Sequence, residues 1–232
     1  MKKDGVRFRK SVYVTLSFII AIWMIKIFEY TLDFDLGSLG ILPRTIKGSI
    51  GILTAPLIHG DIYHLLSNTF PIIFLGVGIF YFYDKIATIV IGLIYIMTGF
   101  WVWIAARDAY HIGASGVVYG MLTFLLFSGF IRRDTQTLSI SFIVLFLYGG
   151  GFATGLVPTD AGISWESHLM GAIAGVFCAI YFKNFKLAQA KVEEEKVEES
   201  NITYRYQYLE KGNQAPSQGT TYTIKVSLSR ET

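Results

Sequence analysis

The chain has 232 residues, of which 53% are hydrophobic and only 16% are charged. A soluble domain carries about 25% charged residues, so a soluble fold of this length could not cover so much apolar surface, and lipid is the expected solvent. The net charge of +3 indicates neither a nucleic-acid partner nor an acidic substrate, and a single cysteine, Cys178, excludes an internal disulfide and a cysteine-rich metal site.

Long windows without charged residues divide the chain into apolar segments. A helix needs about 20 residues to span the bilayer core. Five windows reach that length, and the sixth does so if its helix starts near Trp165. The sequence therefore predicts an all-α membrane protein with six transmembrane helices, at residues 11–31, 62–82, 86–105, 114–131, 137–156 and 165–183.

The first apolar segment, residues 11–31, follows a basic stretch, which is also typical of a secretory signal peptide. The apolar run is long, however, and Lys26 and Glu29 interrupt it only near its end. No small-residue cleavage site follows it. We therefore interpret the segment as a transmembrane helix.

The connection between the first two helices, residues 32–58, is long and semi-apolar, with glycines at positions 37, 40, 48 and 51. Loops of this length in compact domains are usually functional or disordered. Its apolar residues lead us to expect that it partly inserts into the outer leaflet.

The distribution of basic residues indicates the orientation in the membrane. With the N-terminus inside, the outer loops carry only Arg44, Lys47 and Arg107. The inner segments carry ten basic residues: Lys2, Lys3, Arg7, Arg9, Lys10, Lys85, Arg132, Arg133, Lys183 and Lys186. We therefore expect a multi-pass protein of the bacterial cell (inner) membrane, with both termini in the cytoplasm.

Three parts are expected along the chain: a cytoplasmic N-terminus at 1–10, a six-helix domain at 11–185 and a short cytoplasmic tail at 186–232. In the tail, tyrosines alternate with polar residues after position 203, and apolar residues alternate again from Tyr222 to Leu228. Two such strands could pair as a small β-hairpin, although an isolated hairpin is marginally stable.

The chain has four histidines, His59, His64, His111 and His168, and all fall at or near the outer ends of predicted helices. Ionisable groups in a bilayer are costly, so each is a functional candidate. The second, fourth and sixth helices all run inward, which brings their polar groups to one leaflet and one depth. For His111 alone, we favour an interfacial histidine that reaches for water.

Ser115 opens the fourth helix and His168 lies near the start of the sixth. Small residues predict that these two helices pack closely, with both side chains at the top of the seam; they are Gly116, Gly120, Gly171 and Gly175. A serine within hydrogen-bond reach of a histidine is the minimum for nucleophilic acyl transfer. The alternative is that Ser115 only caps its helix.

The surroundings of Ser115 fit a nucleophile. Glycines such as Gly113 let a substrate backbone approach closely. Amides in the first helical turn can face a developing oxyanion, and His64 and Asn68, which share a helix face, could add side-chain donors. The alternative for Asn68 is a plain helix–helix hydrogen bond.

Together these motifs resemble the rhomboid family of intramembrane serine proteases. Three pieces match the order, spacing and helix assignment of the family's six-helix core, over roughly residues 40–183: His59-x4-His64-x3-Asn68, Gly113-Ala114-Ser115-Gly116 and His168-x2-Gly171-x3-Gly175. One departure lies in the first outer loop, where the family often has a Trp-Arg pair. Here Leu42-Pro43-Arg44 contains no tryptophan.

The resemblance implies a six-helix rhomboid-like bundle with a Ser115–His168 dyad and no acidic third member. It also implies an oxyanion hole formed by His64, Asn68 and the backbone N–H of Ser115, with His59 nearby. One turn below the serine, Tyr119 occupies the place of an aromatic residue that stacks on the catalytic histidine in the family.

The expected function is a serine endopeptidase that cuts transmembrane segments of membrane proteins near the outer leaflet. The alternative is a rhomboid-like pseudoprotease that binds membrane proteins without cleavage, although such a binder would need neither Ser115 nor His168. A channel or transporter is a weaker third reading, because the ionisable residues stop at one leaflet. The expected partners are transmembrane substrates and the lipid bilayer; no metal, cofactor or nucleic acid is implied.

Overall fold

The structure is a computed structural model and describes residues 2–158, 164–185, 203–204 and 222–223. The chain divides into two compact units, Met1–Ala188 and Gln189–Thr232. All helices among the described residues belong to the first unit.

In the second unit, β1 (Thr203–Tyr204) pairs antiparallel with β2 (Tyr222–Thr223). Thr203 lies opposite Thr223 in this register. The remainder of the expected hairpin lies outside the described residues. A full hairpin therefore remains a prediction.

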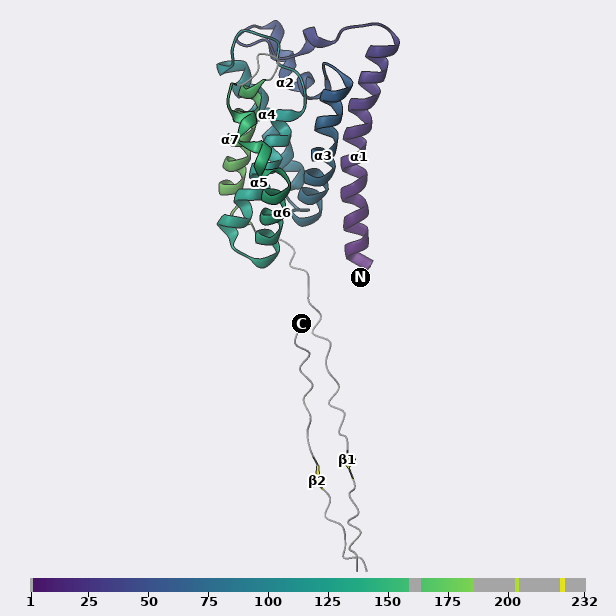
Figure 1. Cartoon of the computed structure of the whole chain (residues 1–232), viewed down its shortest axis with the longest axis vertical. Coiled ribbons are helices and arrows are strands. Elements are labelled where there is room, and N and C mark those ends of the chain that lie inside the picture. The colour runs from purple at the N-terminus through teal and green to yellow at the C-terminus, as the bar shows by residue number, and fades with distance from the viewer. Residues whose placement is uncertain (1, 159–163, 186–202, 205–221, 224–232) are drawn as a thin grey trace, which may run out of the picture. The chain divides into compact units, whose positions relative to one another are not determined.

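Six long helices build the first unit: α1 (Lys2–Thr31), α3 (Ile62–Phe82), α4 (Ala87–Ala105), α5 (Ser115–Arg132), α6 (Thr135–Phe152) and α7 (Trp165–Tyr181) (Figure 1). Their bounds lie close to the predicted ones except at two places. α1 begins nine residues before the predicted start at residue 11, because Lys and Arg favour a helix as well as apolar residues do. α6 ends at Phe152, shortly after three consecutive glycines, which weaken helices.

Among the described residues, four helices are long and apolar enough to cross a membrane: α1, α3, α4 and α5. α6 contributes a shorter apolar helix over Thr135–Gly151, and α7 has 17 residues. Six crossings therefore remain a prediction.

Helices α5 and α7 pack against each other through glycines. A Cβ added to Gly171 would overlap the carbonyl oxygen of Gly116, and one added to Gly175 would overlap that of Gly120. The hydroxyl of Thr123 donates across the seam to the carbonyl of Ala172, at 2.9 Å. The predicted close packing of these two helices is confirmed, and it brings the N-termini of α5 and α7 side by side.

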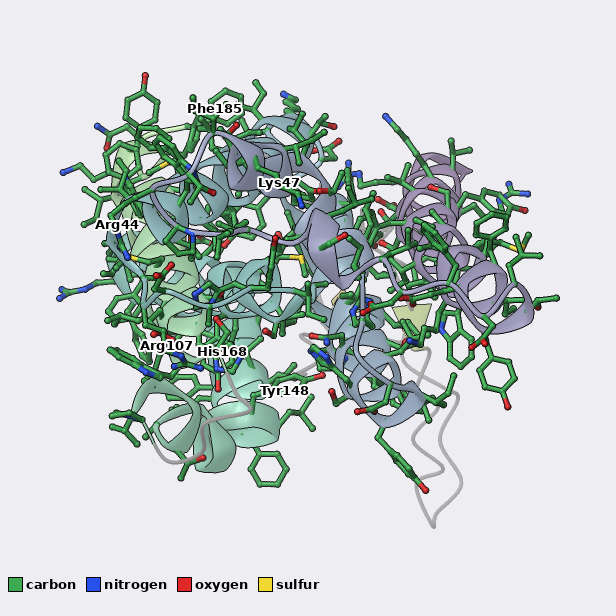
Figure 2. All side chains as sticks on the ribbon, turned by 90° about the horizontal axis from the view of Figure 1, so that it is seen from above. Arg44, Lys47, Arg107, Tyr148, His168 and Phe185 are labelled. Carbon is green, nitrogen blue, oxygen red and sulfur yellow. The ribbon has the colours of Figure 1, made fainter. Side chains whose placement is uncertain are left out.

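The long first connection folds into short helices: η1 (Gly37–Leu39), η2 (Lys47–Ile50), α2 (Gly51–Thr54) and η3 (Ala55–Leu57). Arg44, labelled in Figure 2, donates from Nη1 to the carbonyl of Ala106 at 2.6 Å and from its amide to the carbonyl of Trp103 at 2.8 Å. The Trp103 indole donates back to the carbonyl of Thr45, at 2.9 Å. These bonds tie the connection to the end of α4, although the connection has no tryptophan of its own. Its insertion into the leaflet remains a prediction.

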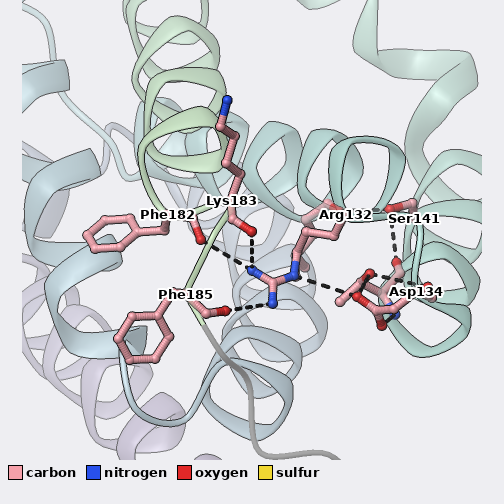
Figure 3. Close-up of polar contacts among 8 residues, drawn as sticks. Arg132, Asp134, Ser141, Phe182, Lys183 and Phe185 are labelled. Atoms are coloured by element: carbon pink, nitrogen blue, oxygen red, sulfur yellow. Dashed lines mark hydrogen bonds and ion pairs between the residues drawn. The ribbon is translucent and has the colours of Figure 1, made fainter.

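At the C-terminal end of α5, Arg132 bonds the segment that follows α7 (Figure 3). Its guanidinium donates to the carbonyls of Phe182, Lys183 and Phe185, at 3.2, 3.0 and 2.7 Å. It also pairs with Asp134, at 3.6 Å. α7 ends at Tyr181, so these three carbonyls belong to the segment that follows the helix, and one side chain of α5 holds that segment in place.

Candidate active site

A cavity of about 780 Å³ lies among α3, α5, α6, α7 and the connection between α4 and α5. Five of the seven predicted site residues line it: His64, Asn68, Ser115, Tyr119 and His168. The other two, His59 and Gly113, lie behind this wall and contact residues close to it. The structure thus brings all seven into one region.

Ser115 is the first residue of α5, and the residue at the helix cap is Ala114. The alternative in which Ser115 merely caps the helix is therefore wrong. Gly113 precedes the cap with φ of 104°, a backbone conformation that favours glycine. This turn places Ser115 in the cavity wall, at a helix end whose first amides have no intrahelical acceptor.

The ring of His64 lies directly against this turn. A Cβ added to Gly113 would come within 2.6 Å of Cε1 and Nε2 of His64, so only glycine leaves room for the imidazole. One turn further along α3, Asn68 is 3% exposed and donates from Nδ2 to the carbonyl of His64, at 2.9 Å. One N–H of the Asn68 side chain therefore bonds its own helix, and Asn68 also lines the cavity.

His168 is held on two sides. Its Nδ1 lies 2.8 Å from the carbonyl oxygen of Gly155, in the short helix η4 (Thr154–Leu156). A carbonyl oxygen can only accept, so Nδ1 carries the hydrogen and Nε2 is left as an acceptor in the neutral ring. The ring stacks on Tyr119, with centroids 4.2 Å apart and planes 3° apart. Both contacts fix the orientation of the imidazole.

His59 supports the turn before Ser115 from behind. It is 1% exposed, its ring centroid lies 5.1 Å from that of His64, and its Nε2 accepts from the amide of Ala114 at 3.4 Å. Burial, with smaller effects from His64 and Lys26, lowers the pKa of His59 to about 4, which keeps the ring neutral and able to accept. Although two histidines meet here, no third metal-binding side chain joins them within the described residues.

The expectation that His111 reaches for water is wrong. Its side chain is 1% exposed, with Nδ1 2.6 Å from Oγ of Ser164 and Nε2 3.1 Å from the carbonyl oxygen of Arg107. Its backbone pairs with Ile41 of the first connection in an antiparallel bridge. Burial lowers the pKa of His111. This histidine therefore joins three segments around the cavity.

An ion pair beside the cavity was not anticipated. Nη1 of Arg107 lies 3.1 and 2.9 Å from the two carboxylate oxygens of Glu166, which is 5% exposed. Figure 2 labels Arg107 near His168, and both line the cavity. The pair ties the α4–α5 connection to the first turn of α7, two residues before His168. In the sequence, Glu166 was the residue that could have indicated this ion pair, because an acidic residue that is buried at the start of an apolar helix needs a partner.

The family model of the Rhomboid domain matches residues 48–185. Uncharacterised proteins of Mycobacterium tuberculosis and Mycobacterium bovis are each 33% identical over 178 residues, which cover 71% of this chain and 72% of the relative. RHOMBOID-like protein 4 of Arabidopsis thaliana is 30% identical over 139 residues, which cover 49% of this chain and 34% of the relative. With a domain match over more than half of its length and several apolar helices long enough to cross a membrane, this chain belongs to the rhomboid family of integral membrane proteins.

Proposed function

We propose that this rhomboid protein is an intramembrane serine endopeptidase with Ser115 as nucleophile and His168 as base. Membership of the family points to an intramembrane protease or to a pseudoprotease. The observation that supports the protease is that Ser115 and His168 line the same cavity, from the adjoining N-terminal turns of α5 and α7. A protein that only binds membrane segments has no need of this pair.

The state of His168 suits a base. With its Nδ1 hydrogen committed to Gly155, the lone pair of Nε2 can take the hydroxyl proton of Ser115. In serine proteases with a triad, an acidic residue orients the histidine and stabilises the imidazolium. Here the carbonyl of Gly155 takes the orienting part, and the stacked ring of Tyr119 supports it.

The proposed reaction has two halves. As Oγ of Ser115 attacks the peptide carbonyl, Nε2 of His168 takes its proton, and a tetrahedral oxyanion forms. Collapse of this intermediate breaks the C–N bond, and the imidazolium returns the proton to the leaving amine, which leaves an acyl-serine. Water then attacks the ester with His168 again as base, so that a carboxylic acid is released and Ser115 is restored.

The oxyanion would be stabilised by His64, Asn68 and the backbone N–H of Ser115. The side chains of His64 and Asn68 line the cavity beside the serine, and Asn68 keeps a second N–H that its own helix does not use. Donors fixed in a dry site stabilise developing charge far more than donors in water. His59 and Gly113 would support this group from behind.

The proposed substrates are transmembrane segments of other proteins, which enter from the bilayer and are cut near the outer leaflet. This follows from the orientation given by the basic residues, with both termini in the cytoplasm of a bacterial cell. Peptide carbonyls within a helix are occupied by hydrogen bonds, so we expect cuts near small or helix-breaking residues at the outer end of the substrate helix.

The experiment is cleavage of a reporter with one transmembrane helix in proteoliposomes, followed by mass mapping of the cut. We expect wild type to cut near the outer end of the helix, and Ser115→Ala and His168→Ala to leave the reporter intact. A folded wild type that binds a panel of such reporters without cutting any of them would favour the pseudoprotease. A cut mapped to the cytoplasmic end would contradict the proposed orientation.

A further inference from the structure

Two charged side chains lie in the apolar helix α1 and take no part in the proposed reaction. α1 packs against α3 at the edge of the bundle (Figure 1). Near its C-terminal end, the side chains of Lys26 and Glu29 are 12% and 9% exposed. Charged groups within an apolar span are costly, so this pair calls for a specific role.

All three hydrogens of the Lys26 ammonium group have acceptors. Nζ lies 3.0 Å from Oε2 of Glu29, 2.9 Å from the carbonyl of His59 and 2.9 Å from the carbonyl of Gly60. The other carboxylate oxygen of Glu29 accepts from the amide of Leu36, at 2.9 Å. The pair therefore joins α1 to the segment before α3 and to the start of the first connection.

The segment that Lys26 holds leads directly to the nucleophile. Gly60 lines the cavity, and His59 accepts from the amide of Ala114, the residue before Ser115. One ammonium group is thus separated from the turn that carries Ser115 by a single residue. His59, which is that residue, also packs its ring against the ring of His64, the proposed oxyanion donor.

We propose that Lys26 is a positioning residue, which holds the His59–Gly60 segment so that the turn before Ser115 and the oxyanion donors keep their places. The inference rests on the proposed function for its catalytic consequence, but not for the contacts themselves. It makes α1 part of the catalytic unit, although α1 lies outside residues 48–185, which match the family domain.

A role in helix packing alone would have different consequences, and the chain offers a matched control. At the other end of α1, Arg7 pairs with Asp84 before α4, at 3.5 Å. Arg7→Met and Lys26→Met each remove one basic group that ties α1 to the rest of the bundle. Only Lys26 contacts a segment that reaches the cavity.

The first readout is independent of activity. Hydrogen exchange is followed by mass spectrometry on the purified full chain in detergent, in peptides that cover residues 57–61 and 112–116. We expect Lys26→Met to speed exchange in both by about tenfold or more, because loss of a tertiary contact lowers the free energy of local opening. Arg7→Met should leave them unchanged. Equal exchange in Lys26→Met and wild type would overturn the inference.

The second readout is the rate at which a fluorophosphonate labels Ser115 in folded protein. A misplaced nucleophile turn should slow labelling of Lys26→Met by about tenfold to a hundredfold, with Lys26→Arg closer to wild type and Arg7→Met equal to it. Faster exchange with an unchanged labelling rate would reduce Lys26 to a packing residue and overturn its positioning role. A wild type that never labels would refute the proposed function, while the exchange data would still decide the contact.

Lys26→Met leaves Glu29 as an unpaired buried charge and could fail to fold. The double variant Lys26→Met/Glu29→Gln removes both charges and keeps an oxygen for the amide of Leu36. Glu29→Gln alone, which retains the lysine contacts to His59 and Gly60, is its control. The double variant should show the faster exchange and slower labelling, and Glu29→Gln should show neither; equal behaviour of the two would overturn the inference.

Discussion

The ring of Tyr119 lies flat on the ring of His168, with centroids 4.2 Å apart and planes within 3°. Tyr119 follows Ser115 by one helical turn on α5, so this contact joins the helix of the proposed nucleophile to the helix of the proposed base. A Cβ added to Gly155 would overlap the hydroxyl of Tyr119. The backbone of η4 therefore lies against the stacked pair and presents its carbonyl to His168.

The first prediction concerns this stack. Tyr119→Leu should lower kcat by about threefold to tenfold, because an aromatic pair contributes about 0.5–1.5 kcal/mol beyond the area it buries. Tyr119→Phe keeps the ring and should lose less. The measurement is the cleavage rate of a saturating reporter in detergent. If the phenylalanine variant is as impaired as the leucine variant, the hydroxyl and not the stack is what matters.

The second prediction tests the glycine seam. Gly171→Ala places a Cβ on the carbonyl of Gly116 and should destabilise the protein by about 1–3 kcal/mol or more, as overpacking does. Gly92 on α4 is the control, since nothing lies within 4 Å of a Cβ added there. Gly92→Ala should be neutral or slightly stabilising. Thermal unfolding in detergent measures both, and equal unfolding temperatures for the two variants would contradict close packing of α5 on α7.

The third prediction concerns the oxyanion. Asn68→Ala should lower kcat by roughly 10²–10³, the cost of losing one oxyanion donor. It should leave the unfolding temperature nearly unchanged, since polar contacts in membranes average about 0.6 kcal/mol. Thr69, the next residue of α3, is the matched control. It is also buried, but its hydroxyl accepts a hydrogen bond from the indole of Trp23 on α1. An Asn68→Ala protein that is unstable but fully active when folded would support the alternative, in which Asn68 only makes a helix–helix hydrogen bond.

The fourth prediction follows from the lowered pKa of His59, about 4 against 6.5 in the unfolded chain. Between these values the unfolded state binds a proton that the folded state excludes, so stability falls as the pH drops from 6.5 to 4. The loss is about 3 kcal/mol when fully expressed. His59→Gln keeps an acceptor for Ala114 and does not titrate, so its unfolding temperature should fall less over this range. An identical fall in both proteins would contradict burial of a neutral His59.

The sequence predicted the helices well because charged residues mark where a span must end. The starts of α3 and α7 were placed at Ile62 and Trp165, as observed. The start of α1 was placed too late because charge was taken as the end of the helix, whereas charge marks only the end of an apolar span. The close approach of α5 and α7 followed from glycine spacing alone.

Contacts between distant segments could not be predicted in this way. Burial of His111 depends on Ser164, which lies 53 positions later, and no periodicity connects them. In the sequence, Lys26 only interrupts an apolar run, and its hydrogen bond to the carbonyl of His59 becomes visible only in the fold. Such pairs depend on tertiary geometry, and a single sequence carries no signal of it beyond the cost of leaving a buried charge alone.

The most direct test of the Ser115–His168 dyad is labelling of purified protein with a fluorophosphonate, with the modified residue located by mass spectrometry. A serine hydroxyl reacts poorly unless a base takes its proton, so wild type should be labelled at Ser115, His168→Ala only weakly and Ser115→Ala not at all. Ser128→Ala, which removes another buried serine of α5 away from the cavity, should be labelled like wild type. Labelling of His168→Ala at the wild-type rate, or of wild type at any residue other than Ser115, would contradict the dyad.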